Sequence, residues 1–239
     1  MAAGRGERLR PLTDNTPKPL LTVKGLPLLS SHLNALLAAG HQDVVINTAW
    51  LESKITDYYG DHFTAPGDLA HALRVHYSLE GQDFGYALET AGGISRAAPL
   101  LDSAFWVVAG DIFVPDFQFA DAIFDRFTDS PYLAHLFLVS NPAHNLKGDF
   151  GLSDDGLALN LAQADSRPKY TYSSIGLFKQ ALFHPPYCLI SPGNPQGKKA
   201  ALAPLLREAM DASLVSAEFL GTDWTDVGTP ERLAALNTV

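Results

Sequence analysis

Short apolar segments alternate with helical segments between residues 29 and 139, and this alternation limits the possible folds more than any other feature. The segments expected to form strands are 44–46, 73–77, 105–108 and 133–139. The segments expected to form helices are 29–39, 51–59, 119–127 and, after an entry loop, 90–101. A repeated strand-then-helix order with apolar strands predicts an α/β fold with a Rossmann-like, doubly wound, mostly parallel sheet. Ligands of such sheets bind at the carboxyl ends of the strands.

The rhythm changes after residue 140. Strand-like pieces at 150–152 and 170–178 lie between polar loops, a loop rich in proline and glycine covers 185–199, and a helix is expected over 200–210. This pattern predicts a partly antiparallel extension of the first sheet. We therefore expect a single domain over residues 1–239, with a first part at 1–140 and a second part at 141–239.

Composition excludes several classes of protein. The formal net charge of -9 argues against broad binding to nucleic acid, which requires a basic surface. Cys188 is the only cysteine, so neither an internal disulfide nor a cysteine-based zinc cluster is expected. The sequence shows neither an apolar run long enough to span a membrane nor an apolar signal segment near Met1. We expect a cytoplasmic protein without membrane association, and a monomer because no coiled coil is visible.

The first chemical motif is the glycine loop Ala2-Ala3-Gly4-Arg5-Gly6, which is followed by Glu7 and Arg8. Small residues let backbone N–H groups approach phosphate oxygens, and an arginine adds a permanent positive charge. The residues alone leave phosphate binding and an ordinary tight turn equally open. A loop of this kind normally follows a strand, and none precedes it here. We therefore expect either a chain start upstream of Met1 or a missing first central strand.

Lys18 lies between Pro17 and Pro19. Each proline fixes its own φ and restrains the residue before it, so the lysine is carried on a stiff segment that can aim its ammonium group. An exposed loop lysine is the more common alternative. The rigid frame nevertheless favours a functional role for Lys18.

Two aspartates lie where a ligand of an α/β sheet would be bound. Asp111 follows the apolar strand 105–108, and Asp226 precedes Gly228 and a helix that starts at Pro230. Either aspartate alone is typical of a helix or strand cap. As a pair they could hold Mg²⁺, which takes one or two carboxylates together with phosphate oxygens. The segment Glu89–Ile94 is equally consistent with a plain helix entry and with a flat surface for a nucleotide base.

Taken together, these motifs resemble the sugar nucleotidyltransferase family. The match runs in order through the glycine loop, Pro-Lys-Pro-Leu, Glu-Thr-Ala-Gly-Gly, Gly-Asp and Asp-Val-Gly-Thr, over nearly the whole chain. The resemblance implies that Lys18 and Arg8 are catalytic, that Asp111 and Asp226 bind Mg²⁺, and that Asp149 and Gly151 bind the sugar. It implies that residues 1–140 bind the nucleotide and residues 141–239 the sugar. The nucleotide-binding positions that it implies are Ala3, Gly4, Gly6, Glu7, Glu80, Gly92, Gly93 and Gly110.

Within the family, three segments resemble the members that act on N-acetylmuramic acid 1-phosphate: 47–51, 88–94 and 141–150. The resemblance implies UTP and this sugar phosphate as substrates, with Lys147 and Lys169 as candidate cations for the lactyl carboxylate. Three alternatives stay open: guanylyl transfer to mannose 1-phosphate, uridylyl or thymidylyl transfer to a hexose 1-phosphate, and a regulatory protein that binds nucleotide sugars without turnover. Lys18, Asp111 and Asp226 together argue against the regulatory alternative.

Overall fold

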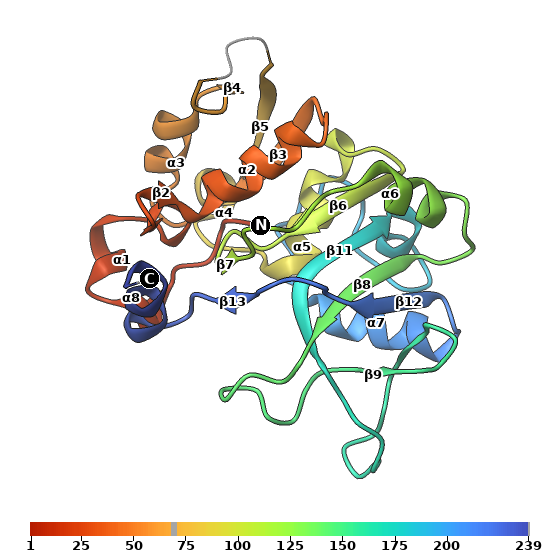
Figure 1. Cartoon of the computed structure of the whole chain (residues 1–239). Coiled ribbons are helices and arrows are strands. Elements are labelled where there is room, and N and C mark those ends of the chain that lie inside the picture. The colour runs from red at the N-terminus through yellow and green to blue at the C-terminus, as the bar shows by residue number, and fades with distance from the viewer. Residues whose placement is uncertain (68–70, 239) are drawn as a thin grey trace.

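The core of the molecule is a four-stranded mixed sheet with the strand order β12-β8-β11-β6 (Figure 1). The computed structural model describes residues 1–67 and 71–238. The four strands are β6 (Ala104–Val108), β8 (Ala134–Val139), β11 (Thr171–Lys179) and β12 (Val215–Phe219). β12 runs parallel to β8, whereas β11 is antiparallel to both β8 and β6. The α/β fold is confirmed, but the sheet is mixed rather than mostly parallel, because β11 returns from the second half of the chain and inserts between two first-half strands.

A second, three-stranded sheet has the order β3-β5-β4. It consists of β3 (Asp43–Thr48), β4 (His62–Phe63) and β5 (Leu73–Leu79). β3 and β5 are parallel, and β4 is antiparallel to β5. β3 is therefore an edge of one sheet and β6 an edge of the other.

The first residues of the chain bridge these two edges at the carboxyl ends of β3 and β6. The Met1 nitrogen donates to the carbonyl of Val108 at 2.6 Å, and the Ala2 nitrogen donates to the carbonyl of Asn47 at 3.2 Å. In the part of the chain that the structure describes, no strand lies between β3 and β6 beyond this bridge.

Helices cover both faces of the sheets. One apolar cluster joins β6, β8 and β12 to α5 (Glu89–Ala97) and α7 (Leu202–Asp211). A second cluster joins β3 and β5 to α2 (Leu28–Ala38) and α3 (Glu52–Tyr59), with α6 (Asp121–Thr128) packed at its border. The helices and strands predicted from periodicity are therefore confirmed, with boundaries that differ by a few residues.

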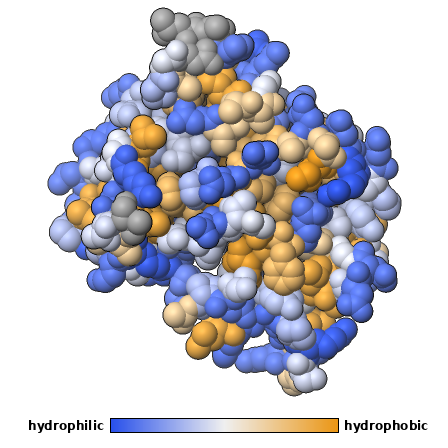
Figure 2. Space-filling model, viewed as in Figure 1, coloured by the Kyte–Doolittle hydropathy of each residue, from blue (hydrophilic) through white to orange (hydrophobic). Residues whose placement is uncertain are grey.

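Small elements complete the fold and frame the ligand-binding edge. In the first part they are η1 (Glu7–Leu9), α1 (Leu12–Asn15), η2 (Lys18–Leu20), β1 (Thr22–Val23), β2 (Leu26–Pro27), α4 (Glu80–Phe84), η3 (Ala98–Leu100) and β7 (Ile112–Phe113). In the second part they are β9 (Gly151–Leu152), β10 (Ala158–Leu159), η4 (Gln180–Phe183), β13 (Thr225–Asp226) and α8 (Pro230–Asn237). None of the helices among the described residues is long and apolar enough to cross a membrane. Figure 2 shows hydrophobic residues in separate patches among hydrophilic ones on this face.

Candidate active site

The glycine loop folds back on itself and leaves an open backbone surface. Gly6 has a φ of +67°, and a Cβ at this position would lie 3.0 Å from Cγ2 of Thr13. The Thr13 hydroxyl donates to the carbonyl of Gly6 at 2.8 Å and holds the turn closed. Gly4, by contrast, has nothing within 4 Å of a virtual Cβ, so a ligand can approach its backbone.

Lys18 and Asp111 are brought together at this loop. Lys18 is 7% exposed, and its Nζ lies 2.6 Å from Oδ2 of Asp111. Pro17 has an extended backbone that leads into η2, as expected for a proline that precedes a short helical turn. The rigid segment therefore does aim the ammonium group, and its partner is the carboxylate predicted to bind metal.

Asp226 lies next to Asp111, although the two are 115 positions apart (226 − 111). β13 pairs antiparallel with β7, which places Asp226 opposite Ile112, and the Val227 nitrogen donates to the carbonyl of Asp111 at 2.9 Å. The two carboxylates are hard oxygen donors, one on β13 and one directly before β7, which suits Mg²⁺ completed by phosphate oxygens. No cluster of three or more His, Cys, Asp or Glu side chains that could hold a metal ion occurs in residues 1–67 and 71–238.

Two arginines surround the Asp226 turn. Arg232 Nη1 donates to Oδ2 of Asp226 at 2.9 Å, and His144 Nε2 lies 3.1 Å from the same oxygen. At Gly228, a virtual Cβ would lie 2.5 Å from Nη2 of Arg232 and 3.1 Å from Nη2 of Arg8. Both guanidinium groups therefore lie close to the backbone of Gly228, and a side chain at this position would displace Arg232. Arg8, a predicted catalytic residue, thus lies at the same edge as Asp226.

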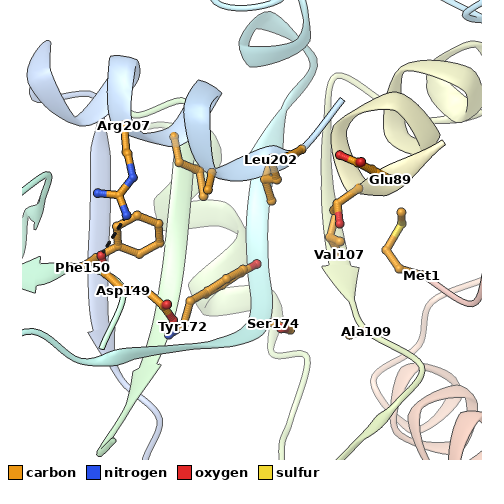
Figure 3. Close-up of a pocket in the computed structure, with 14 residues that line it drawn as sticks. Met1, Glu89, Val107, Ala109, Asp149, Phe150, Tyr172, Ser174, Leu202 and Arg207 are labelled. Atoms are coloured by element: carbon orange, nitrogen blue, oxygen red, sulfur yellow. Dashed lines mark hydrogen bonds between the residues drawn. The ribbon is translucent and has the colours of Figure 1, made fainter. Parts of the chain in front are cut away.

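Two adjoining cavities open beside these groups. The first, of about 450 Å³, is lined by the glycine loop and by Lys18, Gly110 and Asp111. The second, of about 570 Å³, is lined by Asp149 together with β11 and α7 residues (Figure 3). Both cavities share a wall formed by Met1, Glu89, Thr90, Ala109 and Ser174. The shared wall makes one cleft with two compartments, one beside the charged groups and one beside the second half of the chain.

The second compartment contains a fixed arginine. Figure 3 shows the Arg207 side chain extending from α7 toward Phe150 and Asp149. Its Cζ lies 5.1 Å from the centre of the Phe150 ring, Nη1 donates to Oδ1 of Asn160 at 2.8 Å, and Nη2 contacts the carbonyl of Asp149 at 3.3 Å. The Asp149 carboxylate accepts from the Tyr172 nitrogen at 2.9 Å. Packing and hydrogen bonds thus place a cation and a carboxylate in this compartment.

Several residues predicted to contact the nucleotide also take part in close packing. Glu80 is 0% exposed; it accepts from Nδ2 of Asn47 at 2.7 Å and from the Leu88 nitrogen at 2.7 Å, and burial raises the pKa of its carboxyl group. Gly93 packs against Glu80, and Gly92 packs against the carbonyl of Lys198. None of these three residues lines either compartment of the cleft.

Other predicted residues divide in the same way. Ala3, Gly4 and Gly110 line the first compartment, whereas Glu7 is exposed beside Arg5 and lines neither one. Gly151 packs against Leu161 behind Asp149. The structure therefore brings Lys18, Asp111 and the glycine loop to one cavity and Asp149 to the other, and places Gly151 in the supporting core.

The shared wall contains residues for which the sequence gives no local signal. Glu89 has a φ of +60° and Ser174 a φ of +66°, both in the left-handed region that favours glycine. Ser174 lies at an irregularity of β11, where the register with β8 shifts between Tyr172 and Gly176. Such backbone strain is concentrated at functional sites in proteins. The sequence also gave no indication of Arg207, because this residue is indistinguishable in sequence from any other polar position of an amphipathic helix.

The α/β fold has a two-compartment cleft beside a glycine loop, two neighbouring carboxylates and fixed cations. These features are typical of a nucleotide-binding protein that acts on phosphates. The family model described as nucleotidyl transferase matches residues 1–238, and the chain belongs to this family. An N-acetylmuramate alpha-1-phosphate uridylyltransferase from Neisseria meningitidis serogroup B is 41% identical, over 98% of this chain and 93% of the relative. A protein of the same name from Caulobacter vibrioides is 29% identical over the same shares.

Solved structures share the fold at low sequence identity. A Bacillus anthracis structure described as a glucose-1-phosphate thymidylyltransferase in complex with a sucrose superposes with a TM-score of 0.76 at 19% identity, covering 99% of this chain and 91% of that one. A CTP:phosphocholine cytidylyltransferase from Streptococcus pneumoniae superposes with a TM-score of 0.64 at 18% identity, covering 99% and 95%. At this level of identity the likeness concerns the fold alone.

Proposed function

We propose that this protein transfers a uridylyl group from UTP to a sugar 1-phosphate, with N-acetylmuramic acid 1-phosphate as the preferred acceptor. The observation that carries the proposal is the cleft with two compartments and a shared wall. One compartment offers the glycine loop, Lys18 and Asp111 to a triphosphate, and the other offers Asp149 and Arg207 to a sugar. The Neisseria and Caulobacter relatives, which match nearly the whole chain, support the choice of substrates.

The reaction joins two anions, so charge neutralisation and positioning are the main tasks of the site. A phosphate oxygen of the sugar phosphate attacks the α-phosphorus of UTP; the bond from that phosphorus to the bridging oxygen breaks, and pyrophosphate leaves. Backbone N–H groups of the loop at Ala3 and Gly4 hold the triphosphate. The ammonium group of Lys18 and the guanidinium group of Arg8 balance the charge that develops on the phosphates.

The proposal includes Mg²⁺ at Asp111 and Asp226. Asp111 lines the triphosphate compartment and directly precedes β7, and the pairing of β7 with β13 brings Asp226 beside it. Two neighbouring carboxylates fit this ion. When bound, Mg²⁺ would supply positive charge to the phosphate oxygens. Arg232 and His144 hold the Asp226 carboxylate in place from the other side.

Arg207 is our candidate for recognition of the acceptor. N-acetylmuramic acid carries a lactyl ether with a carboxylate, and a site for it needs a cation or a hydrogen-bond donor. Lys147 and Lys169 do not line the cleft, and Lys169 is engaged by the carbonyl of Ala162 at 2.7 Å. Arg207 lines the second compartment, and its stacking on Phe150 fixes its direction. Asp149 would repel the lactyl carboxylate, so we assign it to a sugar hydroxyl or amide. Its two oxygens accept from the Tyr172 nitrogen and from Nδ2 of Asn145 and keep lone pairs for a further donor.

The test is a competition between N-acetylmuramic acid 1-phosphate and N-acetylglucosamine 1-phosphate at limiting UTP, followed by pyrophosphate release. We expect the parent protein to prefer the muramic acid substrate, and Arg207→Gln to lose about 10- to 100-fold of that preference, as for loss of a charged hydrogen bond. Arg207→Lys, which keeps the charge, should retain part of it. Equal specificity constants for the two sugars in the parent, or a preference for mannose 1-phosphate with GTP, would assign a different substrate within the family. Absence of turnover with every pair would favour a regulatory binding protein.

A further inference from the structure

Arg8 and Arg232 are far apart in the sequence, and one apolar cluster brings them together. Leu9 and Val227 are buried in this cluster, and Leu233 of α8 packs against it. Figure 1 shows α8 beside the first elements of the chain. Arg8 directly precedes Leu9, and Arg232 directly precedes Leu233. The apolar core therefore fixes where the backbone of each arginine lies. We call these two residues the arginine pair.

The guanidinium groups of the arginine pair converge at Gly228. A Cβ at this glycine would lie 2.5 Å from Nη2 of Arg232 and 3.1 Å from Nη2 of Arg8. The same Cβ would lie 3.0 Å from Oδ1 of Asp226. Because Gly228 has no side chain, one nitrogen of each arginine and one carboxylate oxygen can approach the same small space.

The bonds within the protein leave these three atoms for a ligand. Arg232 holds Oδ2 of Asp226 through Nη1, and His144 contacts the same oxygen. Over residues 1–67 and 71–238, neither Nη2 of the arginine pair nor Oδ1 of Asp226 has a hydrogen-bond or ion-pair partner. One carboxylate balances only one of the two guanidinium groups, so the space keeps an excess of positive charge. An anion with several oxygens suits such a space, because arginine binds phosphate oxygens through charged hydrogen bonds.

The position of the arginine pair identifies the part of the substrate that it would bind. Neither arginine lines a compartment of the cleft. Arg232 and Asp226 line a separate cavity of about 490 Å³, whereas Asp111, which adjoins Asp226, lines the first compartment. In phosphoryl transfer the attacking and leaving oxygens are roughly in line. With the acceptor in the second compartment, the leaving group departs on the opposite side of the α-phosphorus, and it needs cations outside that compartment.

We propose that Arg232 binds the leaving pyrophosphate directly, together with Arg8. This inference rests on the nucleotidyl transfer proposed above. When the bond from the α-phosphorus to the bridging oxygen breaks, its electron pair stays on that oxygen, which becomes a terminal oxygen of pyrophosphate. Nη2 of each arginine donates a hydrogen bond to pyrophosphate oxygens, and no proton is transferred. Asp226 holds Arg232 through Nη1, so Nη2 is oriented before the charge develops.

The test separates binding of pyrophosphate from the hold that Arg232 has on Asp226. Arg232→Gln and His144→Gln each remove one of the two groups on Oδ2 of Asp226, but only Arg232 also faces Gly228. Isothermal titration calorimetry at saturating Mg²⁺ would give the Kd of pyrophosphate and of uridine 5′-monophosphate, which has no β- or γ-phosphate. Electron paramagnetic resonance would give the Kd of Mn²⁺ for the same variants.

We expect Arg232→Gln to raise the Kd of pyrophosphate at least about 10-fold above that of His144→Gln, as for loss of a charged hydrogen bond. Arg232→Lys, which keeps the charge but not the second amino group, should give an intermediate Kd. Binding of uridine 5′-monophosphate should stay close to that of the parent in both glutamine variants, which also shows that they are folded. Binding of Mn²⁺ should weaken in both, because both lose a contact with Asp226.

Two results would overturn the proposal. An equal rise in the Kd of pyrophosphate for Arg232→Gln and His144→Gln would mean that Arg232 acts only through Asp226. An Arg232→Gln variant that binds pyrophosphate as tightly as the parent would exclude the contact altogether. Either result in a parent that transfers uridylyl groups would leave the proposed function standing. Conversely, a parent that binds pyrophosphate through Arg232 but turns over no sugar phosphate would support this inference and contradict the proposed function.

Discussion

At the scale of single residues, Lys18 shows how a stiff backbone segment can serve the chemistry of the site. Its ammonium group is buried beside Asp111 at 2.6 Å rather than exposed to solvent. A cation held in a fixed direction stabilises charge that develops during phosphoryl transfer more than it adds to ground-state binding. We therefore expect Lys18→Ala to lower kcat by about 10²- to 10³-fold and to change nucleotide binding much less.

Steady-state kinetics together with equilibrium titration of UTP would check this expectation. Lys24→Ala, which removes an exposed lysine at a turn with a φ of +51°, is the control for loss of a positive charge. A Lys18 variant with unchanged kcat and only a raised KM would contradict the role, because that result is the signature of uniform binding.

Asp111 and Asp226 are the two proposed ligands of the metal ion. Asp226 lies on β13 and Asp111 directly precedes β7, with which β13 pairs. Their spacing of 115 positions does not reveal this proximity, since β13 and β7 meet only in the folded chain. Asp111→Asn keeps the size of the side chain and removes its charge. We expect turnover to fall by at least about 10²-fold and Mn²⁺ binding, measured by electron paramagnetic resonance, to weaken, while the far-UV spectrum stays unchanged. Asp116→Asn, at an exposed loop position, is the matched control. Full turnover of Asp111→Asn at low Mg²⁺ would rule out the shared metal site.

At the scale of elements, α5 is positioned by a buried carboxylate. Glu80 bonds to Asn47 of β3 and to the Leu88 nitrogen just before α5, and Asn47 in turn accepts from the Ala2 nitrogen at 2.8 Å. One network thus joins a strand, a helix start and the glycine loop. Gly93 permits it, because a Cβ there would lie 2.6 Å from Oε1 of Glu80.

We expect Gly93→Ala to lower the free energy of unfolding by about 1–3 kcal/mol, as for overpacking of a core. Alanine is otherwise the better helix former, so the sign of the effect isolates the contact with Glu80. Urea unfolding would measure it. Gly221→Ala, where a Cβ meets nothing within 4 Å, is the control. A gain in stability for Gly93→Ala would show that Glu80 moves aside without cost.

The same scale shows what the sequence could predict and what it could not. Periodicity located the main helices and strands because each buries an apolar stripe or run. The order of the motifs singled out Lys18 and Asp111 as candidates. The sequence could not place β11 between β6 and β8, since strand order depends on contacts between distant segments. Nor could the sequence show that Glu80, Gly92 and Gly93 lie in close packing, because a buried carboxylate and closely packed glycines look the same in sequence as a binding loop. The positive φ values of Ser174 and Glu89 could not be predicted either, because neither residue type favours the left-handed region.

At the scale of the whole molecule, the two halves of the chain are interleaved. β11 and β12 of the second half pair with β6 and β8 of the first, and β13 pairs with β7 beside Asp111. The cleft therefore draws its two compartments from both halves, and neither half contains a complete site. We accordingly propose that residues 1–239 unfold as one cooperative unit rather than as two.

Acid should weaken this unit through buried histidines. Burial lowers the pKa of His32 to about 4, and its Nε2 lies 3.0 Å from the carbonyl of Ile112, to which the neutral ring can donate. Burial also lowers the pKa of His135 to about 4. Because the unfolded chain protonates these rings near pH 6.5, it binds more protons than the folded protein between pH 6.5 and pH 4. The stability that both rings contribute is therefore complete above pH 6.5 and is lost as the pH falls toward 4.

For His32 alone, the lowered pKa corresponds to a loss of about 3 kcal/mol in the free energy of unfolding between pH 6.5 and pH 4. Urea unfolding at a series of pH values between 4 and 7 would measure it. His32→Gln keeps a donor for Ile112 but does not titrate, so we expect its stability to depend on pH less steeply than that of the parent, with His135 contributing part of the remaining slope. If His32→Gln retained the full slope, protonation of this ring would not be what destabilises the fold in acid, and the apolar cluster around α2 would have to tolerate a charge.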